Sequence, residues 1–427
     1  MENIKKRSTW QSRRKFLFSA LRRTAAAWNR KALIAAVLLL TPFALSVSAE
    51  AAIVKPEDLD DRSLVGQTVT LWFEGPSLSD EVKEMIRDYR IGGVILFSKP
   101  DNLQNPAQIA RLIGDLQNCA KGWGVPPLFV AVDQEGGRVA RLREEQGCTH
   151  FPPTGDIASL GDPALIRAAA SASARQIRKL GFNWNCVPCL DLNSNPANPI
   201  IGSRALGSEP ERVLSFGREI LDAHKEARVM TSVKHFPGHG DTSVDSHVSL
   251  PRVDRSMEEL EGFELLPFKG AVESGVPAVM TAHILAPKLD AELPATLSPA
   301  ILSILRDRWK FQGLIVTDSM GMGAIVKKWT LPLASRLALN AGVDVLLFGA
   351  DGHSREDQLA TLKALYEDLQ SGLLSREKLR RSAARILAAK EALGLFDDPM
   401  PTLKDGEIPQ TEADAALAQH IDELLNR

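Results

Sequence analysis

The segment KHFPGHGDTSVDSH, from Lys234 to His247, concentrates side chains that can bind polar groups and transfer protons. Its fourteen residues include three histidines, two aspartates and a lysine. In an extended loop residues i and i+2 point the same way, so Asp245 can hold the imidazole of His247 by a hydrogen bond. This spacing favours His247 as a proton donor that Asp245 orients.

A donor needs a nucleophile or an activated water opposite it, and VTDSMGMGAI supplies a carboxylate. Asp318 follows buried-type aliphatic residues and precedes Gly321 and Gly323, which allow close approach of backbone. A single aspartate after a strand is often a helix cap, but its pairing with the histidine loop favours catalysis.

Two other interpretations of the loop are a metal site and a solvated polar loop. His235, His239, Asp241 and His247 have metal-binding side chains, yet no pair has the spacing that places two ligands on one helical face. The sequence therefore predicts no metal and no cofactor.

Eight apolar or β-branched runs alternate with segments of helical period, which predicts an α/β fold. The runs cover residues 68–75, 92–98, 128–133, 182–192, 232–238, 278–285, 314–320 and 343–349. Polar residues follow the third to seventh runs, as expected where active-site loops leave the carboxyl ends of barrel strands. We predict a single (β/α)₈ TIM-type barrel without a second α/β sandwich domain, with a doubly wound open sheet as the alternative.

Three regions are expected along the 427 residues: an export signal or membrane anchor at 1–49, the barrel domain at 50–398 and a C-terminal tail at 399–427. The first region is basic and then apolar at 32–47, a run short for a spanning helix, and small residues at 47–49 suit cleavage. SRRKFL, residues 12–17, is similar to a twin-arginine signal. Export to the periplasm, with a membrane tether if the signal stays, is the expectation.

The overall charge is balanced, with 51 basic and 53 acidic side chains, so no nucleic-acid partner is expected. The composition leaves the oligomeric state open. In an exported chain four cysteines can pair, and we expect Cys119 with Cys148 because turn-rich sequence flanks both. Cys186 and Cys189 are expected to be buried thiols or a local bridge.

The loop of His247 and VTDSMGM, together with VDQEGGRVAR (132–141) and NSNPANPIIGSRALGSEP (193–210), resemble the β-N-acetylglucosaminidase branch of glycoside hydrolase family 3. The resemblance covers residues 64–396 and implies that Asp318 is a nucleophile forming a covalent glycosyl-enzyme, with His247 and Asp245 as the acid/base pair. It also implies a carbohydrate substrate held by five residues: Asp133, Arg141, Arg204, Lys234 and His235. Glu135 and Arg138 are expected to support a turn, His239 to stabilise its loop, and His283 to lie behind the site.

The resemblance implies a retaining exo-β-N-acetylglucosaminidase acting on peptidoglycan fragments or chitin-like oligosaccharides. An imidazole has an ordinary pKa of ~6.5 against ~4.3 for glutamate, so it needs less adjustment to donate a proton at neutral pH. Gly238 and Gly240 are expected to form a hinge that moves the donor. The alternatives are a β-glucosidase or a phosphorylase of the same family, a metal-dependent barrel hydrolase, and a wall-binding protein with a decayed site.

Overall fold

The computed structural model describes residues 55–427 except 100, 352 and 405. Eight parallel strands form its main sheet, in the order β10-β1-β2-β3-β6-β7-β8-β9. A bridge between Val316 and Val345 joins the last strand back to the first, so the sheet closes into a barrel. The strands are β1 (Val69–Leu71), β2 (Gly93–Ile95), β3 (Phe129–Val132), β6 (Trp184–Asn185), β7 (Met230–Phe236), β8 (Ala278–Thr281), β9 (Leu314–Thr317) and β10 (Leu346–Leu347).

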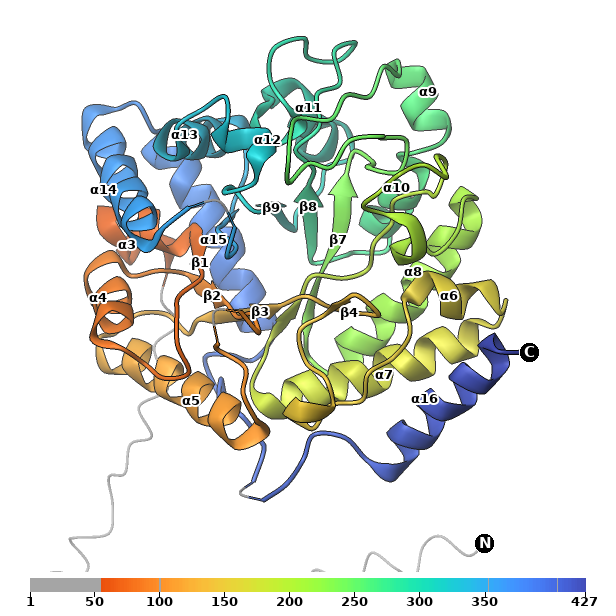
Figure 1. Cartoon of the computed structure of the whole chain (residues 1–427). Coiled ribbons are helices and arrows are strands. Elements are labelled where there is room, and N and C mark those ends of the chain that lie inside the picture. Colours follow the sequence, from red (N-terminus) through yellow and green to blue (C-terminus); the bar gives the residue numbers. More distant parts are fainter. Residues whose placement is uncertain (1–54, 100, 352, 405) are drawn as a thin grey trace, which may run out of the picture. The chain divides into compact units, whose positions relative to one another are not determined.

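Helices surround these strands, as Figure 1 shows. Those that follow the strands in turn are α4 (Asp80–Tyr89), α5 (Pro106–Gly122), α7 (Pro163–Leu180), α8 (Pro210–Glu226), α10 (Leu266–Glu273), α11 (Pro299–Ser303), α13 (Leu331–Ala341) and α14 (Arg355–Ser371). The remaining α-helices are α3 (Asp61–Gln67), α6 (Thr154–Ser159), α9 (Met257–Gly262), α12 (Gly323–Val326), α15 (Arg376–Ala392) and α16 (Glu412–Leu425). Every residue of the eight strands is buried, as expected for a parallel sheet covered by helices.

Local signals explain where the long helices start and stop. Asn105 caps α5 and Asp162 caps α7, in each case with proline at the first helical position, where its missing N–H costs nothing. Gly181 ends α7 and Gly342 ends α13 in the left-handed conformation that glycine adopts without strain. The sequence therefore places the helix boundaries around the barrel largely by local chemistry.

The prediction of a (β/α)₈ barrel is confirmed, and each predicted run overlaps one strand; β7 begins two residues before its predicted run. The run 182–192 is the least regular: only Trp184 and Asn185 form a strand, because Pro188 has no N–H to donate. Beyond it, Leu190 N still donates to Lys234 O at 2.7 Å.

Three elements were not expected from the sequence. A hairpin of β4 (Gln134–Gly136) and β5 (Val139–Ala140) follows β3, and a π-helical turn, η5 (Ile304–Arg308), follows α11. The tail contains α16, which runs along α7 in Figure 1 and is tied to it by an Arg175–Asp414 ion pair of 2.8 Å.

The predicted disulfide between Cys119 and Cys148 is wrong, because all four cysteines are free thiols. Gly147, next to Cys148, packs against Pro106 at the start of α5. Cys119 lies thirteen residues further along that helix, about 20 Å at the helical rise per residue. Cys186 and Cys189 are buried thiols, one of the two predicted states.

The predicted export signal or anchor lies outside the described residues. Among residues 55–427, apart from the three gaps, no helix has the length and apolar character needed to cross a membrane.

Candidate active site

A cavity of about 370 Å³ lies at the carboxyl ends of the barrel strands. That volume is near the lower end of the range for small-molecule sites. It is lined by seven of the eight residues predicted for the site: Asp133, Arg141, Arg204, Lys234, His235, His247 and Asp318. The eighth, Asp245, lies outside the lining and contacts His247. Residues from the ends of β3, β7 and β9 and from the segments of Arg141, Arg204 and His247 thus meet around one space.

One wall of the cavity is a buried cluster of opposite charges around Glu135. Arg204 donates to both oxygens of Glu135 at 2.8 Å, and Lys234 Nζ lies 2.5 Å from Glu135 Oε1 and 3.1 Å from Asp133 Oδ1. Burial would raise the pKa of Glu135, but the two cations lower it well below its usual value. Glu135 was expected only to support a turn; it is the anion that holds the two cations in place.

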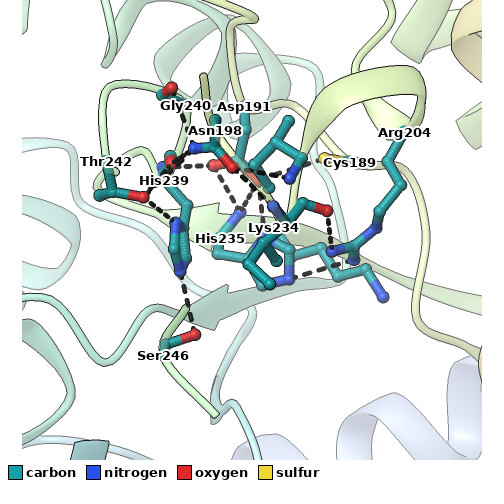
Figure 2. Close-up of polar contacts among 12 residues, drawn as sticks. Cys189, Asp191, Asn198, Arg204, Lys234, His235, His239, Gly240, Thr242 and Ser246 are labelled. Carbon is teal, nitrogen blue, oxygen red and sulfur yellow. Dashed lines mark hydrogen bonds and ion pairs between the residues drawn. The ribbon is translucent and has the colours of Figure 1, made fainter. Parts of the chain in front are cut away.

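Asp191 orients the histidines of this wall, as Figure 2 shows. Its carboxylate accepts hydrogen bonds from His235 Nδ1 at 2.6 Å and from the backbone N of His239 at 2.6 Å. The other ring nitrogen of His235, Nε2, lies 3.4 Å from Arg204 Nη2. Because His235 lines the cavity, Asp191 fixes a ring that a ligand can contact.

Asp318 stands directly after β9, where its backbone N donates to Thr281 O at 3.2 Å. Burial would raise the pKa of its carboxyl, but His235, His283, His247 and the N–H of Ser319 lower it to about 2. Asp318 is therefore an anion across the working range of most enzymes. A buried carboxylate with this charge state can act as a nucleophile.

His283 supports the Asp318 segment from behind. It is fully buried, and its two ring nitrogens lie 2.8 Å from Thr296 Oγ1 and 2.8 Å from Ser319 O. It does not line the cavity, so the structure places it behind the site.

His247 lies at the mouth of the cavity with 57% of its side chain exposed. Asp245 Oδ1 accepts from both the backbone N of His247 at 2.8 Å and its Nδ1 at 2.9 Å. The second ring nitrogen of His247, Nε2, therefore points away from Asp245. An imidazole held in this way by a carboxylate can donate and accept a proton at Nε2.

The loop of His247 is docked on the start of α12. Gly323 N donates to His247 O at 3.1 Å, and Ala324 N donates to Ser246 O at 3.0 Å. A Cβ on Gly323 would lie 2.5 Å from His247 O, so glycine is required for this contact. Gly321 likewise makes room for Asp351 O and His353. The two glycines allow close backbone approach, as predicted.

Gly238 and Gly240 have a different role from the predicted hinge. A Cβ on Gly240 would lie 1.6 Å from Leu192 O, so this glycine is needed for close packing. His239 between them is buried and lies 2.8 Å from Thr242 Oγ1 and 3.0 Å from Ser246 Oγ. The first half of the loop is thus a packed foundation, and His239 stabilises it as expected.

Several residues of the site were missed by sequence reasoning. Asp191 has a weak signal, its position after the fourth apolar run, and Asn198 donates to the carbonyls of His239 and Gly240. Asp351 lines the cavity beside Asp318 and accepts from Ser319 Oγ at 2.5 Å. Burial and the charge of Asp318 raise the pKa of Asp351.

Among the described residues, one group of three side chains has ligand atoms close enough to share a metal ion: Cys189, Asp191 and His235, within 4.8 Å. These atoms already bond one another, since Cys189 Sγ donates to Asp191 Oδ2 at 3.1 Å. Burial raises the pKa of Cys189 well above its usual value, which keeps the thiol protonated. The group therefore serves as a hydrogen-bonded support for His235.

The arrangement can bind a polyhydroxylated ring and cleave a bond at one of its carbons. Charged donors and acceptors line one wall, and sugar hydroxyls can bond to both kinds. An ionised carboxylate and an imidazole with an orienting carboxylate line the same space. These are the groups that glycoside hydrolysis with retention requires, with imidazole in place of the second carboxyl.

Comparisons with known proteins agree with this chemistry. Beta-hexosaminidase A of Pseudoalteromonas piscicida is 37% identical over 380 residues, which are 82% of this chain and 62% of that protein. The chain thus spans less than two thirds of that relative. A solved family 3 beta-N-acetylglucosaminidase from Paenibacillus sp. is 38% identical with a TM-score of 0.80, over 86% of this chain and 69% of that one.

A solved beta-glucoside phosphorylase, BglX, is more distant, with 26% identity and a TM-score of 0.77 over 90% of this chain and 69% of that chain. The model of the glycosyl hydrolase family 3 N terminal domain matches residues 60–389, most of the described barrel. The chain belongs to glycosyl hydrolase family 3.

Proposed function

We propose that the protein is a retaining exo-β-N-acetylglucosaminidase that releases terminal β-linked N-acetylhexosamine. The observation that carries the proposal is that Asp318 and the Asp245-held His247 line one cavity together with the charged wall of Asp133, Arg204 and Lys234. The similarity to beta-hexosaminidases supports the choice of N-acetylhexosamine.

In the proposed mechanism, the carboxylate of Asp318 attacks the anomeric carbon while His247 Nε2–H protonates the departing oxygen. The C–O bond to the leaving group breaks and a glycosyl-aspartate forms. The neutral imidazole of His247 then removes a proton from water, whose oxygen displaces Asp318 from the anomeric carbon. Two inversions at one carbon give net retention.

The sugar is held in this proposal by the charged wall. Asp133 accepts hydrogen bonds from hydroxyl groups, while Arg141, Arg204 and Lys234 donate to them. His235, whose ring Asp191 orients, provides one more hydrogen-bonding nitrogen. We also propose export through the basic and apolar N-terminus, which would bring the enzyme to peptidoglycan fragments.

Aryl β-N-acetylglucosaminide and aryl β-glucoside, assayed with the purified wild type, Asp318→Ala and His247→Ala, test the proposal. We expect the wild type to prefer the N-acetylglucosaminide and Asp318→Ala to lose turnover of both substrates. A slow 2-fluoro or 5-fluoro sugar should leave a covalent adduct on Asp318 by peptide mass mapping. Release of the inverted anomer, seen by NMR at early times, would refute retention.

Phosphorolysis is a second candidate, because a neutral imidazole repels phosphate less than a carboxylate would, and one structural relative is a beta-glucoside phosphorylase. Turnover in phosphate should be compared with turnover in an inert buffer of equal ionic strength. A sugar 1-phosphate product would support this alternative, and free sugar at equal rates in both buffers supports hydrolysis.

A further inference from the structure

A groove of about 370 Å³ continues from the cavity over the loop after β2 and the β4–β5 hairpin. Phe97, Lys99 and Arg141 line both spaces, so a molecule in the cavity can extend into the groove. We refer to it as the basic groove because four of its lining residues are cationic: Lys99, Arg138, Arg141 and Arg143. Glu145 is its one acidic lining residue.

Among the described residues, only one of these four cations forms an ion pair. Within the part of the chain that the structure describes, neither Lys99 nor Arg143 has a carboxylate within ion-pair distance, and both are exposed. Arg138 donates to the backbone carbonyls of Pro199 and Ile200, which carry no net charge. Only Arg141 is paired, with Asp133 Oδ2 at 3.4 Å.

This local excess of positive charge stands in a chain whose net charge is -2. A groove lined by one sign of charge concentrates ligands of the opposite sign. Arginine in particular matches the planar geometry of a carboxylate, with which it forms paired hydrogen bonds. Arg141 Cζ lies over the ring of Phe97, at 5.3 Å from its centre, and both residues stand at the junction of the two spaces.

We infer that the basic groove binds a carboxylate carried by the aglycone of the substrate, and that the preferred substrate is therefore an acidic glycan. The inference rests on the proposed function and extends it. Of the two substrate classes that the sequence leaves open, peptidoglycan fragments carry such a carboxylate on the lactyl group of N-acetylmuramic acid where no peptide is attached, and on the stem peptide where one is. Chitin-like oligomers are neutral and gain nothing from the groove.

The test compares kcat/KM for three substrates with the same β-1,4 bond to N-acetylglucosamine. One has N-acetylmuramic acid as aglycone, the second has the same aglycone with its lactyl carboxylate amidated and a stem peptide attached, and the third is neutral chitobiose. The variants are Lys99→Gln/Arg143→Gln and, as a matched control, Lys121→Gln, an exposed cation on α5 outside the groove.

We expect the double variant to lower the ratio of kcat/KM on an acidic substrate to kcat/KM on chitobiose by roughly 2- to 30-fold, from the loss of two exposed ion contacts. Lys121→Gln should match the wild type throughout. Raising the salt concentration should reduce the wild-type preference for the acidic substrate and leave the double variant unchanged. If kcat/KM falls only for the N-acetylmuramic acid substrate, the lactyl carboxylate is the group that the basic groove binds. If it falls only for the peptide substrate, the groove binds a carboxylate of the peptide.

An equal kcat/KM ratio of acidic to neutral substrates in the wild type and the double variant would overturn the inference. Failure of the proposed function looks different, because the wild type would then be inactive on the aryl N-acetylglucosaminide as well.

Discussion

Gly323→Ala should displace His247, the proposed proton donor, relative to Asp318, the proposed nucleophile. The added Cβ would lie 2.5 Å from His247 O and 2.8 Å from Val248 O. A carbon and an oxygen in contact normally stand about 3.3 Å apart, so the backbone at His247 must retreat by about 0.8 Å or α12 must shift. Either response breaks the 3.1 Å bond from Gly323 N to His247 O.

The size of the effect follows from the role of His247. A misplacement of about 1 Å can cost on the order of 100-fold in rate, and general acid catalysis contributes roughly 10²- to 10⁴-fold. We therefore expect kcat/KM to fall about 10- to 100-fold for an alkyl N-acetylglucosaminide, whose leaving oxygen needs the proton. With a dinitrophenyl aglycone, which leaves without protonation, the fall should be less than about 3-fold.

The assay is a leaving-group series measured on Gly323→Ala, the wild type and Gly262→Ala. Gly262 ends α9, and a Cβ there has no neighbour within 4 Å, so this control should behave as the wild type. Thermal unfolding of each variant separates a local shift from unfolding. If Gly323→Ala lowered kcat/KM equally for all leaving groups, or not at all, the proposed role of this contact would be wrong.

Three further outcomes are expected. Burial lowers the pKa of Lys390 from 10.5 to about 7, so the unfolded chain binds more protons between these values and stability rises with pH across them. Lys390→Met should therefore raise the free energy of unfolding by a few kcal/mol more at pH 6 than at pH 9, since one pKa unit corresponds to about 1.4 kcal/mol. Urea unfolding at the two pH values measures this difference, and the same gain at both would contradict the prediction. Glu135→Gln leaves the buried Arg204 without its carboxylate and Lys234 with Asp133 alone, and it should cost about 3–5 kcal/mol in urea unfolding; a change under 1 kcal/mol would show that the cluster relaxes. Incubation with EDTA should leave kcat/KM unchanged, and restoration of lost activity by added metal would indicate a metal enzyme.

The barrel could be predicted from the sequence because its strands are buried on both faces and so read as continuous apolar runs. The β4–β5 hairpin could not, because three- and two-residue strands such as Gln134–Gly136 and Val139–Ala140 have too few positions to show a period. The disulfide prediction failed because flanking turns say nothing about the distance between two sulfur atoms.

The positions of the candidate site residues were predictable where they depend on a strand end or a short spacing, as for Asp318 directly after β9 and Asp245 beside His247. It was not predictable where function depends on contacts between distant segments. Asp191 is 44 positions from His235, and Glu135 is 69 positions from Arg204. The sequence around Asp191 or Glu135 does not distinguish either carboxylate from that of an ordinary turn residue. Only the folded structure shows that Asp191 binds His235 and that Glu135 binds Arg204.

The ammonium group of Lys234 has three N–H bonds to give. Asp133 and Glu135 take two of them before any sugar arrives. One N–H of Lys234 remains, so it can donate to a single hydroxyl oxygen. That oxygen must lie on the side of the ammonium group that the two carboxylates leave open. In its proposed role as a sugar ligand, Lys234 is therefore expected to select for hydroxyl stereochemistry: an epimer whose oxygen points elsewhere finds no free N–H, so discrimination at that carbon needs no steric clash.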